Sequence, residues 1–310
     1  MAMSATLFVS QSLVDHHSIP PSHPESPLRP LSIETILRQS GLWSDLGHAT
    51  AVPADTNALL RVHTARYIEQ LHLITPKKGT ILAAEDTPMA SDTLHAATEA
   101  AGAGIMAVEA VLRGDYKNAF CAVRPPGHHA EPTKSKGFCF LNNIAIAAQH
   151  AIHCMGIKRV CIFDFDVHQC NGTIEALGNN PHVLIVSTFQ HPLYPFSHYF
   201  NQPANVVNIP LQEGCSSIEY RRHCESKIFN AISQFRPELI LVSAGFDAHQ
   251  DDPLGGLNLI EEDFDWLTRL TKDLAQTYCQ GRIISMLEGG YDLEALANSA
   301  HAHIRALTGK

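Results

Sequence analysis

Residues 159–168 read Arg-Val-Cys-Ile-Phe-Asp-Phe-Asp-Val-His, an apolar run that ends in two aspartates and a histidine. A short apolar run without alternation is typical of a strand buried on both faces of a parallel sheet, and we predict this strand at residues 159–166. In open α/β sheets, ligands bind beyond the carboxyl ends of the strands. The polar end of the run therefore predicts a functional site at that edge of the sheet.

Similar apolar runs alternate with helix-like segments along the rest of the chain. The predicted strands are residues 5–10, 118–123, 159–166, 182–187, 205–210, 239–245 and 282–287. The predicted helices are residues 31–39, 64–71, 91–113, 143–155, 217–235 and 261–280. This alternation predicts an α/β fold with a mostly parallel central sheet flanked by helices. No repeat or low-complexity linker divides the chain, and the proline-rich residues 19–30 suit an ordered surface loop. We therefore expect a single domain, residues 1–310.

Composition narrows the class of protein. The chain has 310 residues, 45% of them hydrophobic, and a net charge of -9. No basic stripe suggests nucleic-acid binding, and the acidic balance weakly favours a basic substrate such as a lysine-rich peptide or a polyamine. No apolar run is long enough for a membrane span, and residues 1–10 do not read as a signal peptide. The eight cysteines form no Cys-x-x-Cys pair, so we expect buried thiols in a reducing compartment, the cytoplasm.

Four fragments with chemical side chains follow four of the predicted strands: Gly127-His128-His129, Asp164-Phe-Asp-Val-His168, Gly245-Phe-Asp247 and Glu288-Gly-Gly-Tyr291. Two carboxylates and an imidazole suit a divalent metal, two adjacent histidines suit proton transfer, and a phenol suits an oxyanion. A purely structural interpretation would make the aspartates strand caps, but buried carboxylates without partners are costly. The set predicts metal-assisted hydrolysis of an amide.

These fragments lie in longer motifs: Arg124-Pro-Pro-Gly-His-His-Ala130, Gly137-Phe-Cys-Phe-Leu-Asn-Asn143, Asp164-Phe-Asp-Val-His168 with Asn171-Gly172-Thr173, Ser243-Ala-Gly-Phe-Asp-Ala-His249 and Glu288-Gly-Gly-Tyr291, preceded by His23-Pro-Glu-Ser-Pro27. In this order they make the chain resemble the zinc-dependent histone deacetylases and their bacterial relatives, the acetylpolyamine amidohydrolases and class II-like deacetylase-like amidohydrolases. The resemblance covers nearly the whole chain. It implies an arginase/deacetylase-like three-layer fold with about eight strands.

The resemblance implies a zinc site made of Asp166, His168 and Asp247. Asp166 and His168 are two residues apart, so on an extended segment both side chains face the same way. Three protein ligands leave a position open for water and the substrate carbonyl. Zinc, iron(II) and cobalt all suit this ligand set.

The resemblance also assigns the proton-transfer roles. His129 would take a proton from the attacking water and return one to the leaving amine, and His128 would assist electrostatically. Asp164 would orient His128, and Asn171 would orient His129. Because some relatives carry Asp in place of Asn171, the amide should leave His129 less basic.

Tyr291 would donate a hydrogen bond to the substrate carbonyl and the oxyanion. A structural potassium ion would use the side chains of Asp164 and Ser187, with the backbones of Asp166, His168 and Thr188. A second monovalent cation would use the backbones of Leu177, Asn180 and Val183.

The substrate tunnel implied by the resemblance has Phe138, preceded by Gly137, as one wall. Tyr194 is the expected second wall, with Phe196 as an alternative. Asp86 is either the rim carboxylate that holds the substrate backbone or the cap of the following helix. Leu254 stands where polyamine-selective relatives can place Glu, which favours acyl-lysine over acetylpolyamine.

One residue departs from the family pattern. Cys170 replaces a usual glycine and would be strained if the position needs a positive φ. The leading hypothesis is a zinc-dependent lysine deacetylase. The alternatives are an acetylpolyamine amidohydrolase, a ureohydrolase of the arginase type and a non-catalytic acyl-lysine binding module. The preferred acyl chain and the oligomeric state stay open.

Overall fold

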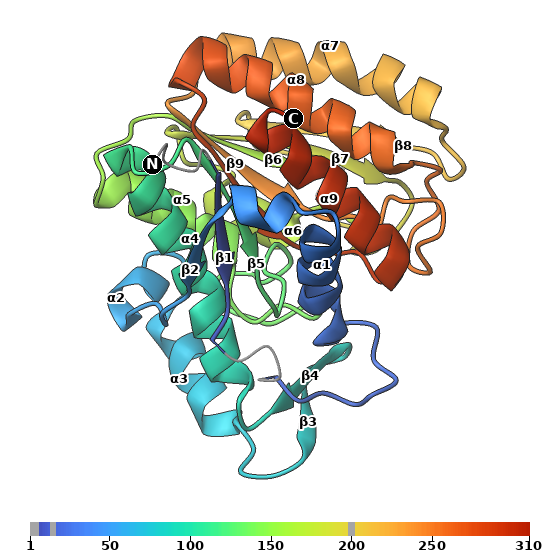
Figure 1. The fold of residues 1–310 in the computed structure, drawn as a ribbon. Helices are drawn as coiled ribbons and strands as arrows, with labels where there is room; N and C mark the ends of the chain where they lie inside the picture. The colour runs from blue at the N-terminus through green and yellow to red at the C-terminus, as the bar shows by residue number, and fades with distance from the viewer. Residues whose placement is uncertain (1–5, 13–16, 198–201) are drawn as a thin grey trace.

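The computed structural model describes residues 6–12, 17–197 and 202–310, so residue 5 of the first predicted strand lies outside the described part. Eight strands form one parallel sheet in the order β2-β1-β5-β10-β9-β6-β7-β8 (Figure 1). Their bounds are β1 (Thr6–Ser10), β2 (Gly47–Thr50), β5 (Asn118–Ala122), β6 (Val160–Asp164), β7 (Val183–Gln190), β8 (Val206–Leu211), β9 (Leu239–Ala244) and β10 (Ile283–Leu287). The predicted α/β fold with a parallel central sheet is confirmed.

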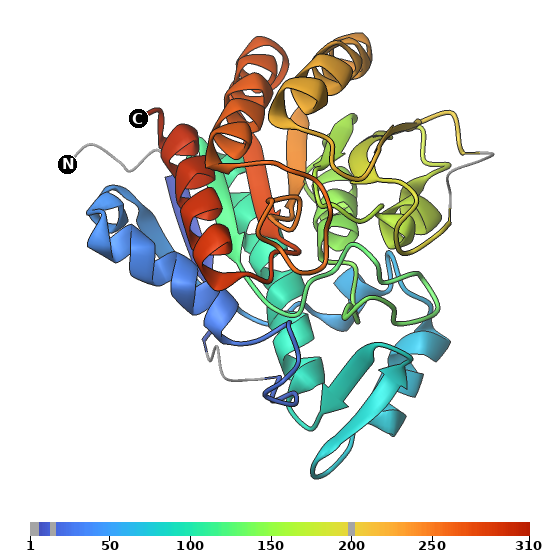
Figure 2. The same ribbon diagram turned by 90° about the vertical axis from the view of Figure 1, so that its right-hand side faces the viewer.

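Helices cover both faces of the sheet (Figure 2). One core lies between the sheet and α1 (Leu28–Gln39), α7 (Ser217–Phe235), α8 (Glu261–Cys279) and α9 (Leu293–Thr308). The other lies between the sheet and α4 (Thr93–Arg113), α5 (Asn143–His153) and α6 (Asn171–Leu177). Within β6, Cys161 and Phe163 belong to the first core, whereas Val160 and Ile162 belong to the second. This is why the strand reads as apolar throughout.

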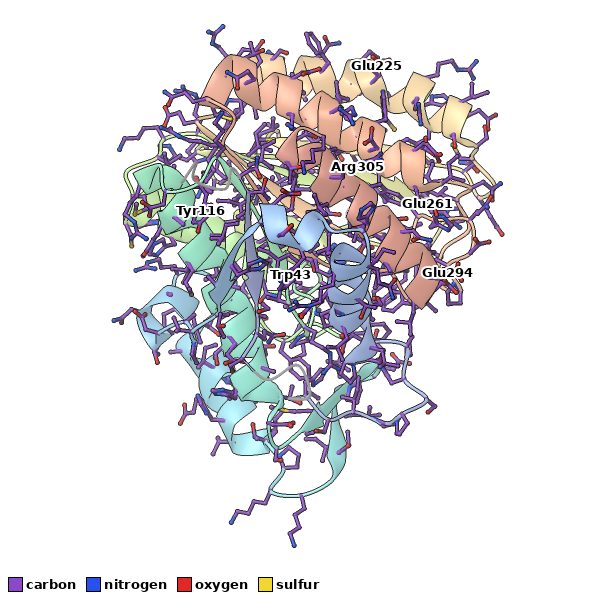
Figure 3. All side chains as sticks on the ribbon, viewed as in Figure 1. Trp43, Tyr116, Glu225, Glu261, Glu294 and Arg305 are labelled. Atoms are coloured by element: carbon purple, nitrogen blue, oxygen red, sulfur yellow. The ribbon has the colours of Figure 1, made fainter. Side chains whose placement is uncertain are left out.

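The outward faces of the helices are polar. Glu225 on α7 and Arg305 on α9 are exposed charged residues in the outer layer (Figure 3). In the part of the chain that the structure describes, no helix is both long and apolar enough to span a membrane. Apart from exposed residues such as Ile218 and Phe229 on α7, the apolar residues of the long helices pack in the two cores.

Several elements differ from the sequence-based expectation. The structure adds β2, the antiparallel hairpin β3 (Thr80–Ala84)–β4 (Thr87–Ala90), α2 (Thr56–Leu59), the 3₁₀ turn Leu42–Asp45, α6 and α9. Helix α3 (Ala65–Ile74) lies close to its predicted place. Helix α1 begins at Leu28, so residues 28–30 are helical and not part of a loop; a proline is tolerated in a first turn because its missing N–H has no partner there.

The sheet order brings the chemical fragments together. Strands β5, β10, β9 and β6 are consecutive neighbours, and each is followed by one of the four fragments. Because all four strands are parallel, their carboxyl ends meet at one edge. The chain bends after Asp164, so residues 165 and 166 lie beyond the end of β6 and not within a strand.

Candidate active site

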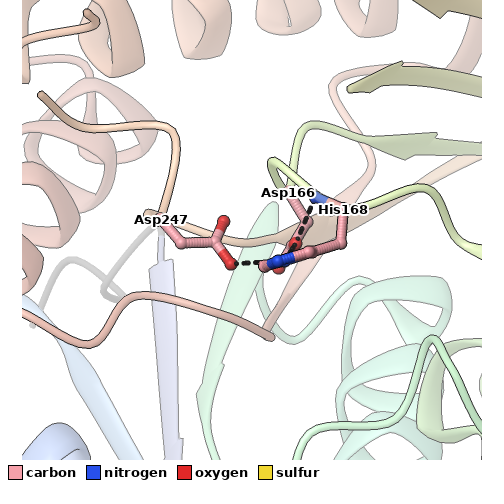
Figure 4. Close-up of side chains that lie close together, drawn as sticks. All are labelled: Asp166, His168 and Asp247. Carbon is pink, nitrogen blue, oxygen red and sulfur yellow. Dashed lines mark hydrogen bonds and ion pairs between the residues drawn. The ribbon is translucent and has the colours of Figure 1, made fainter. Parts of the chain in front are cut away.

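Asp166, His168 and Asp247 form a buried cluster at this edge. His168 Nδ1 lies 3.1 Å from Asp166 Oδ1 and 3.1 Å from Asp247 Oδ2 (Figure 4). One ligand atom from each residue lies within 4.8 Å of the other two. Zinc bonds of about 2.0–2.2 Å at tetrahedral angles separate ligand atoms by roughly 3.3 Å. The donor set and its spacing therefore fit a zinc ion, although the segment that carries the first two ligands is bent and not extended.

Backbone N–H groups hold both carboxylates. Gly289 N donates to Asp166 Oδ2 at 2.8 Å, and Val167 N donates to Asp247 Oδ1 at 2.9 Å. A Cβ atom at Gly289 would lie only 2.0 Å from Asp247 Oδ2. A side chain at this position would displace a ligand, so the close approach requires glycine.

The tandem histidines have the predicted partners. His128 Nδ1 lies 3.0 Å from Asp164 Oδ2, and His129 Nδ1 lies 2.7 Å from Asn171 Oδ1. The two imidazole rings lie side by side, with centroids 4.0 Å apart. In both rings Nδ1 has a side-chain partner, which fixes the ring orientation. His129 lines the cavity, so its Nε2 is the nitrogen that can meet a substrate, whereas His128 Nε2 lies 3.8 Å from Asp166 Oδ2.

Their surroundings push the two pKa values in opposite directions. Burial opposes the charge of His128, but the carboxylates of Asp166, Asp164 and Glu288 outweigh it and raise its pKa well above the usual value. Burial, followed by the positive charge of His128, lowers the pKa of His129 well below the usual value. The structure therefore favours a charged His128 beside a neutral His129, and the low pKa of His129 comes from burial and from His128, since the hydrogen bond to Asn171 raises it.

A cavity of about 260 Å³ opens onto His129 and His168. Its lining combines the reactive side chains with every substrate-binding residue that the sequence suggested: Asp86, His129, Gly137, Phe138, His168, Leu193, Tyr194, Leu254 and Tyr291. The Phe138 and Tyr291 rings meet edge to face, with centroids 5.8 Å apart. The site is therefore a mostly apolar tunnel with polar groups at its inner end.

Tyr194, and not Phe196, belongs to this cavity. The Tyr194 ring lies edge-on to the His129 ring with centroids 5.0 Å apart, whereas Phe196 is 76% exposed. The alternative with Phe196 as a wall is therefore wrong. Burial, together with the neighbouring Asp86 carboxylate, raises the pKa of the Tyr194 phenol, so this hydroxyl stays neutral.

Asp86 lies in the turn between β3 and β4, at the mouth of the cavity. Its Oδ1 accepts hydrogen bonds from Gly137 N at 3.1 Å and from Thr87 Oγ1 at 2.8 Å. The next helix, α4, has Asp92 at its N-cap position, so the interpretation of Asp86 as a helix cap is wrong. Asp86 instead joins the β3–β4 hairpin to the loop that carries Phe138.

The first cation position has suitable groups. Asp164 and Ser187 are register partners on β6 and β7, and both are buried. The Ser187 hydroxyl faces the thiol of Cys170, a weak hydrogen-bonding group, and Asp164 Oδ1 accepts a hydrogen bond from Asp166 N at 3.1 Å. A buried carboxylate beside a buried hydroxyl fits a hard monovalent cation.

The second cation position does not fit. Asn205 Nδ2 lies 3.1 Å from Leu177 O, 3.1 Å from Asn180 O and 2.8 Å from Val183 O. This amide nitrogen lies among the three carbonyl oxygens, so a cation bound to all three would have to displace it. The expectation of a cation there is corrected accordingly.

Cys170 is not strained. It precedes α6 with φ of -78°, an ordinary value for any residue, so the position does not need the positive φ that would have strained it. Its side chain is buried, and burial raises the pKa of the thiol well above the usual value. A neutral buried thiol is a weak nucleophile.

Two further residues support the site, and their roles were not predicted. Glu288 Oε2 accepts hydrogen bonds from Gly127 N at 2.7 Å and from His128 N at 3.0 Å, and burial raises the pKa of this carboxyl to about 7. Arg29 Nε donates to Gly290 O at 2.6 Å, and the guanidinium carbon lies 4.8 Å from the Tyr291 ring centroid. Glu288 opens one of the motifs seen in the sequence and Arg29 follows another by two residues, but their contacts join residues 160 or more positions apart.

Comparisons with known proteins agree with this geometry. A family model described as "Histone deacetylase domain" matches residues 23–307. The chain is 34% identical over 294 residues to the histone deacetylase-like amidohydrolase of Pseudomonas aeruginosa, covering 93% of this chain and 77% of that protein. It is 35% identical over 303 residues to type-2 histone deacetylase 2 of Dictyostelium discoideum, covering 82% of this chain but 18% of that longer protein. The crystal structure of the HDA15 HD domain matches with a TM-score of 0.91 at 30% identity, covering 99% of this chain and 89% of that one.

Proposed function

This chain belongs to the histone deacetylase family of hydrolases, and we propose that it removes the acetyl group from acetyl-lysine in proteins or peptides. The proposal takes residues 1–310 as a single deacetylase domain. One observation carries it: the same mostly apolar cavity is lined by His129, by His168, which we propose as a metal ligand, and by Tyr291. A narrow apolar channel suits the methylene stem of an acylated lysine, and the polar inner end suits its amide.

Asp166, His168 and Asp247 would hold the metal ion, for which we propose zinc. When bound, zinc polarises the amide carbonyl and activates water for attack. Their ligand atoms already lie at mutual distances that suit this ion. Removal of the metal with a chelator should abolish turnover, and zinc should restore it.

We assign proton transfer to His129. Its pKa is lowered, so the ring is neutral and can accept a proton from the attacking water and then deliver one to the leaving lysine amine. Asn171 holds this ring in place, as Asp164 holds His128. A charged His128 stabilises the negative charge that develops on the substrate, and Tyr291 donates a hydrogen bond to the same oxygen.

Substrate choice is proposed from the tunnel lining. Phe138 and Tyr194 would hold the acyl-lysine stem, while Asp86 and Gly137 at the mouth would position the peptide backbone. Leu254 presents no carboxylate to a distal ammonium, which favours acetyl-lysine over acetylpolyamine.

We further propose a structural potassium ion beside Asp164 and Ser187, supported by the buried oxygen atoms that these register partners place side by side. All eight cysteines are free thiols, and seven of them are buried. Free thiols suit a reducing compartment, so we propose a cytoplasmic location.

The decisive experiment measures acetate release from an acetyl-lysine peptide and from acetylputrescine, with zinc-loaded wild type and Tyr291→Phe side by side. We expect peptide turnover that falls about 100-fold or more in the variant, because it loses an oxyanion donor. Preference for acetylputrescine would favour the polyamine amidohydrolase. Binding of a hydroxamate without acetate release from either substrate would favour a non-catalytic acyl-lysine binding module.

A further inference from the structure

Asp252 lies in the loop between β9 and α8, and its carboxylate bridges two segments that line the tunnel. Asp252 Oδ2 accepts hydrogen bonds from Tyr291 N at 2.6 Å and from Asp292 N at 3.4 Å. Asp252 Oδ1 accepts a hydrogen bond from Leu254 N at 2.9 Å. One buried carboxylate thus ties the backbone of the tyrosine to the backbone of a second tunnel residue.

Tyr291 needs such a restraint because the residue before it, Gly290, is conformationally free. Gly290 has φ of +116°, in the region that glycine adopts far more readily than other residues. On the other side, Asp292 caps the start of α9 by accepting a hydrogen bond from Ala295 N at 2.8 Å. Tyr291 therefore lies between a permissive glycine and a fixed helix end. Asp252 is the residue whose side chain holds the N–H group of the tyrosine itself.

We propose that Asp252 is a positioning residue for Tyr291. By fixing the backbone N–H groups on both sides of the tyrosine Cα, the carboxylate keeps the phenol directed into the tunnel, where a hydrogen-bond donor must already be in place when negative charge develops on the substrate. Its second oxygen sets the position of Leu254 relative to the phenol. This inference rests on the proposed function, since it assigns a role within that same reaction.

The variant Asp252→Asn replaces one of the two acceptor oxygens by an NH₂ group with little change in side-chain volume. The amide keeps one oxygen and turns its NH₂ group toward a backbone N–H, so the hydrogen bond from either Tyr291 N or Leu254 N is lost. We expect kcat for an acetyl-lysine peptide to fall about ten-fold or more, with an unchanged zinc content. In the Tyr291→Phe background the same change should lower the residual kcat by less than about two-fold, because the group it positions is already absent.

A matched control is Asp251→Asn, which removes the same charge one residue away. The Asp251 side chain is 65% exposed, and its nearest charged contact is His249 Nδ1 at 3.7 Å. This control should keep the wild-type kcat. Asp252→Glu is the second variant should the amide weaken folding, because it keeps the charge but moves the acceptor oxygens by one methylene. We expect it too to lower kcat in the wild-type background but not in the Tyr291→Phe background. Equal fold-losses in the wild-type and Tyr291→Phe backgrounds, or an unchanged kcat in both Asp252 variants, would overturn the proposal.

A binding measurement separates this inference from the proposed function. A hydroxamate bound to zinc-loaded protein accepts the phenol hydrogen bond without any turnover. We expect its affinity to fall about ten-fold in Asp252→Asn but to change little when the substitution is added to Tyr291→Phe. A wild type that releases no acetate would end the deacetylase proposal, whereas the dependence of hydroxamate affinity on both residues would still support the positioning role.

Discussion

At Gly289 the absence of a side chain leaves room for the carboxylates of the proposed metal site. A methyl group there would lie 2.0 Å from Asp247 Oδ2 and 2.6 Å from Asp166 Oδ2. We predict that Gly289→Ala lowers zinc affinity by about 10–100-fold, the range typical of disturbed ligand support. Competition with a chromophoric chelator would measure this affinity.

The control for this prediction is Gly156→Ala, in a turn with open space around its Cα and φ of +75°. This variant should lose about 1 kcal/mol of stability through backbone strain but bind zinc as the wild type does. A zinc affinity in Gly289→Ala equal to that of the control would contradict the steric explanation.

At the residue scale, the sequence predicted which side chains come together but only part of what supports them. Asp166, His168 and Asp247 were expected as one cluster from the family resemblance, and the structure does bring them together. Asp164 and Asn171 were likewise expected beside the two histidines. The roles of Glu288 and Asp252 could not be predicted. Their partners are backbone N–H groups in distant loops, and the residue types in a sequence do not show which backbone N–H groups are used.

At the scale of elements, burial decided which predictions succeeded. The central strands are apolar on both faces and were found within a few residues of their ends. Strand β2 lies at the edge of the sheet and alternates between half-buried and exposed residues over Gly47–Thr50, so its pattern is short and weak. Helix α9 was missed although Asp292 caps its first turn, because that aspartate directly follows the tyrosine motif.

Asn205 provides a prediction at this scale, since it joins the start of β8 to the segment between α6 and β7. Its amide nitrogen lies within hydrogen-bonding distance of three backbone carbonyls, two of which also accept a backbone N–H. We predict that Asn205→Ala lowers the free energy of unfolding by about 1 kcal/mol, because the hydrogen bonds donated by the amide are lost while Leu177 O and Asn180 O keep their backbone donors. Potassium should restore part of this loss in the variant, since the vacated carbonyls can then bind a cation. Urea unfolding with and without potassium measures both effects.

Asn57→Ala is the comparison for this experiment, because Asn57 is exposed on α2. It should change the free energy of unfolding by less than about 0.5 kcal/mol with or without potassium. Rubidium bound among these three carbonyls in crystals of the wild type would refute the replacement of a cation by Asn205.

At the scale of the whole molecule, a buried histidine links stability to pH. His303 on α9 bonds to Thr268 Oγ1 at 2.6 Å and to Ser285 Oγ at 2.9 Å, so it joins α9 to α8 and β10. Burial lowers its pKa from 6.5 to about 3. The folded protein therefore keeps the ring neutral, whereas the unfolded chain binds a proton below pH 6.5. The contribution of His303 to the free energy of unfolding is complete above pH 6.5 and is lost progressively as the pH falls toward 3.

Between pH 7 and pH 5 this difference corresponds to about 2 kcal/mol, at roughly 1.4 kcal/mol for each pH unit below 6.5. We predict that the loss of unfolding free energy over this interval is smaller in His303→Gln than in the wild type by that amount. His72 is exposed, so His72→Gln should retain the wild-type loss. Urea unfolding at the two pH values would decide, and equal losses in His303→Gln and the wild type would contradict the assignment.

The strand order also determines when the site can exist as the chain is synthesised. Strand β10 lies between β5 and β9 in the sheet, yet it is the last of the eight strands in the sequence. A chain emerging from the ribosome has made His128, Asp166 and Asp247 before β10 arrives to join the two halves of the sheet. Until Gly289 and Tyr291 have followed it, the ligands lack a backbone donor and the tunnel lacks its phenol. A nascent chain released early would thus carry most of the reactive groups but no assembled centre.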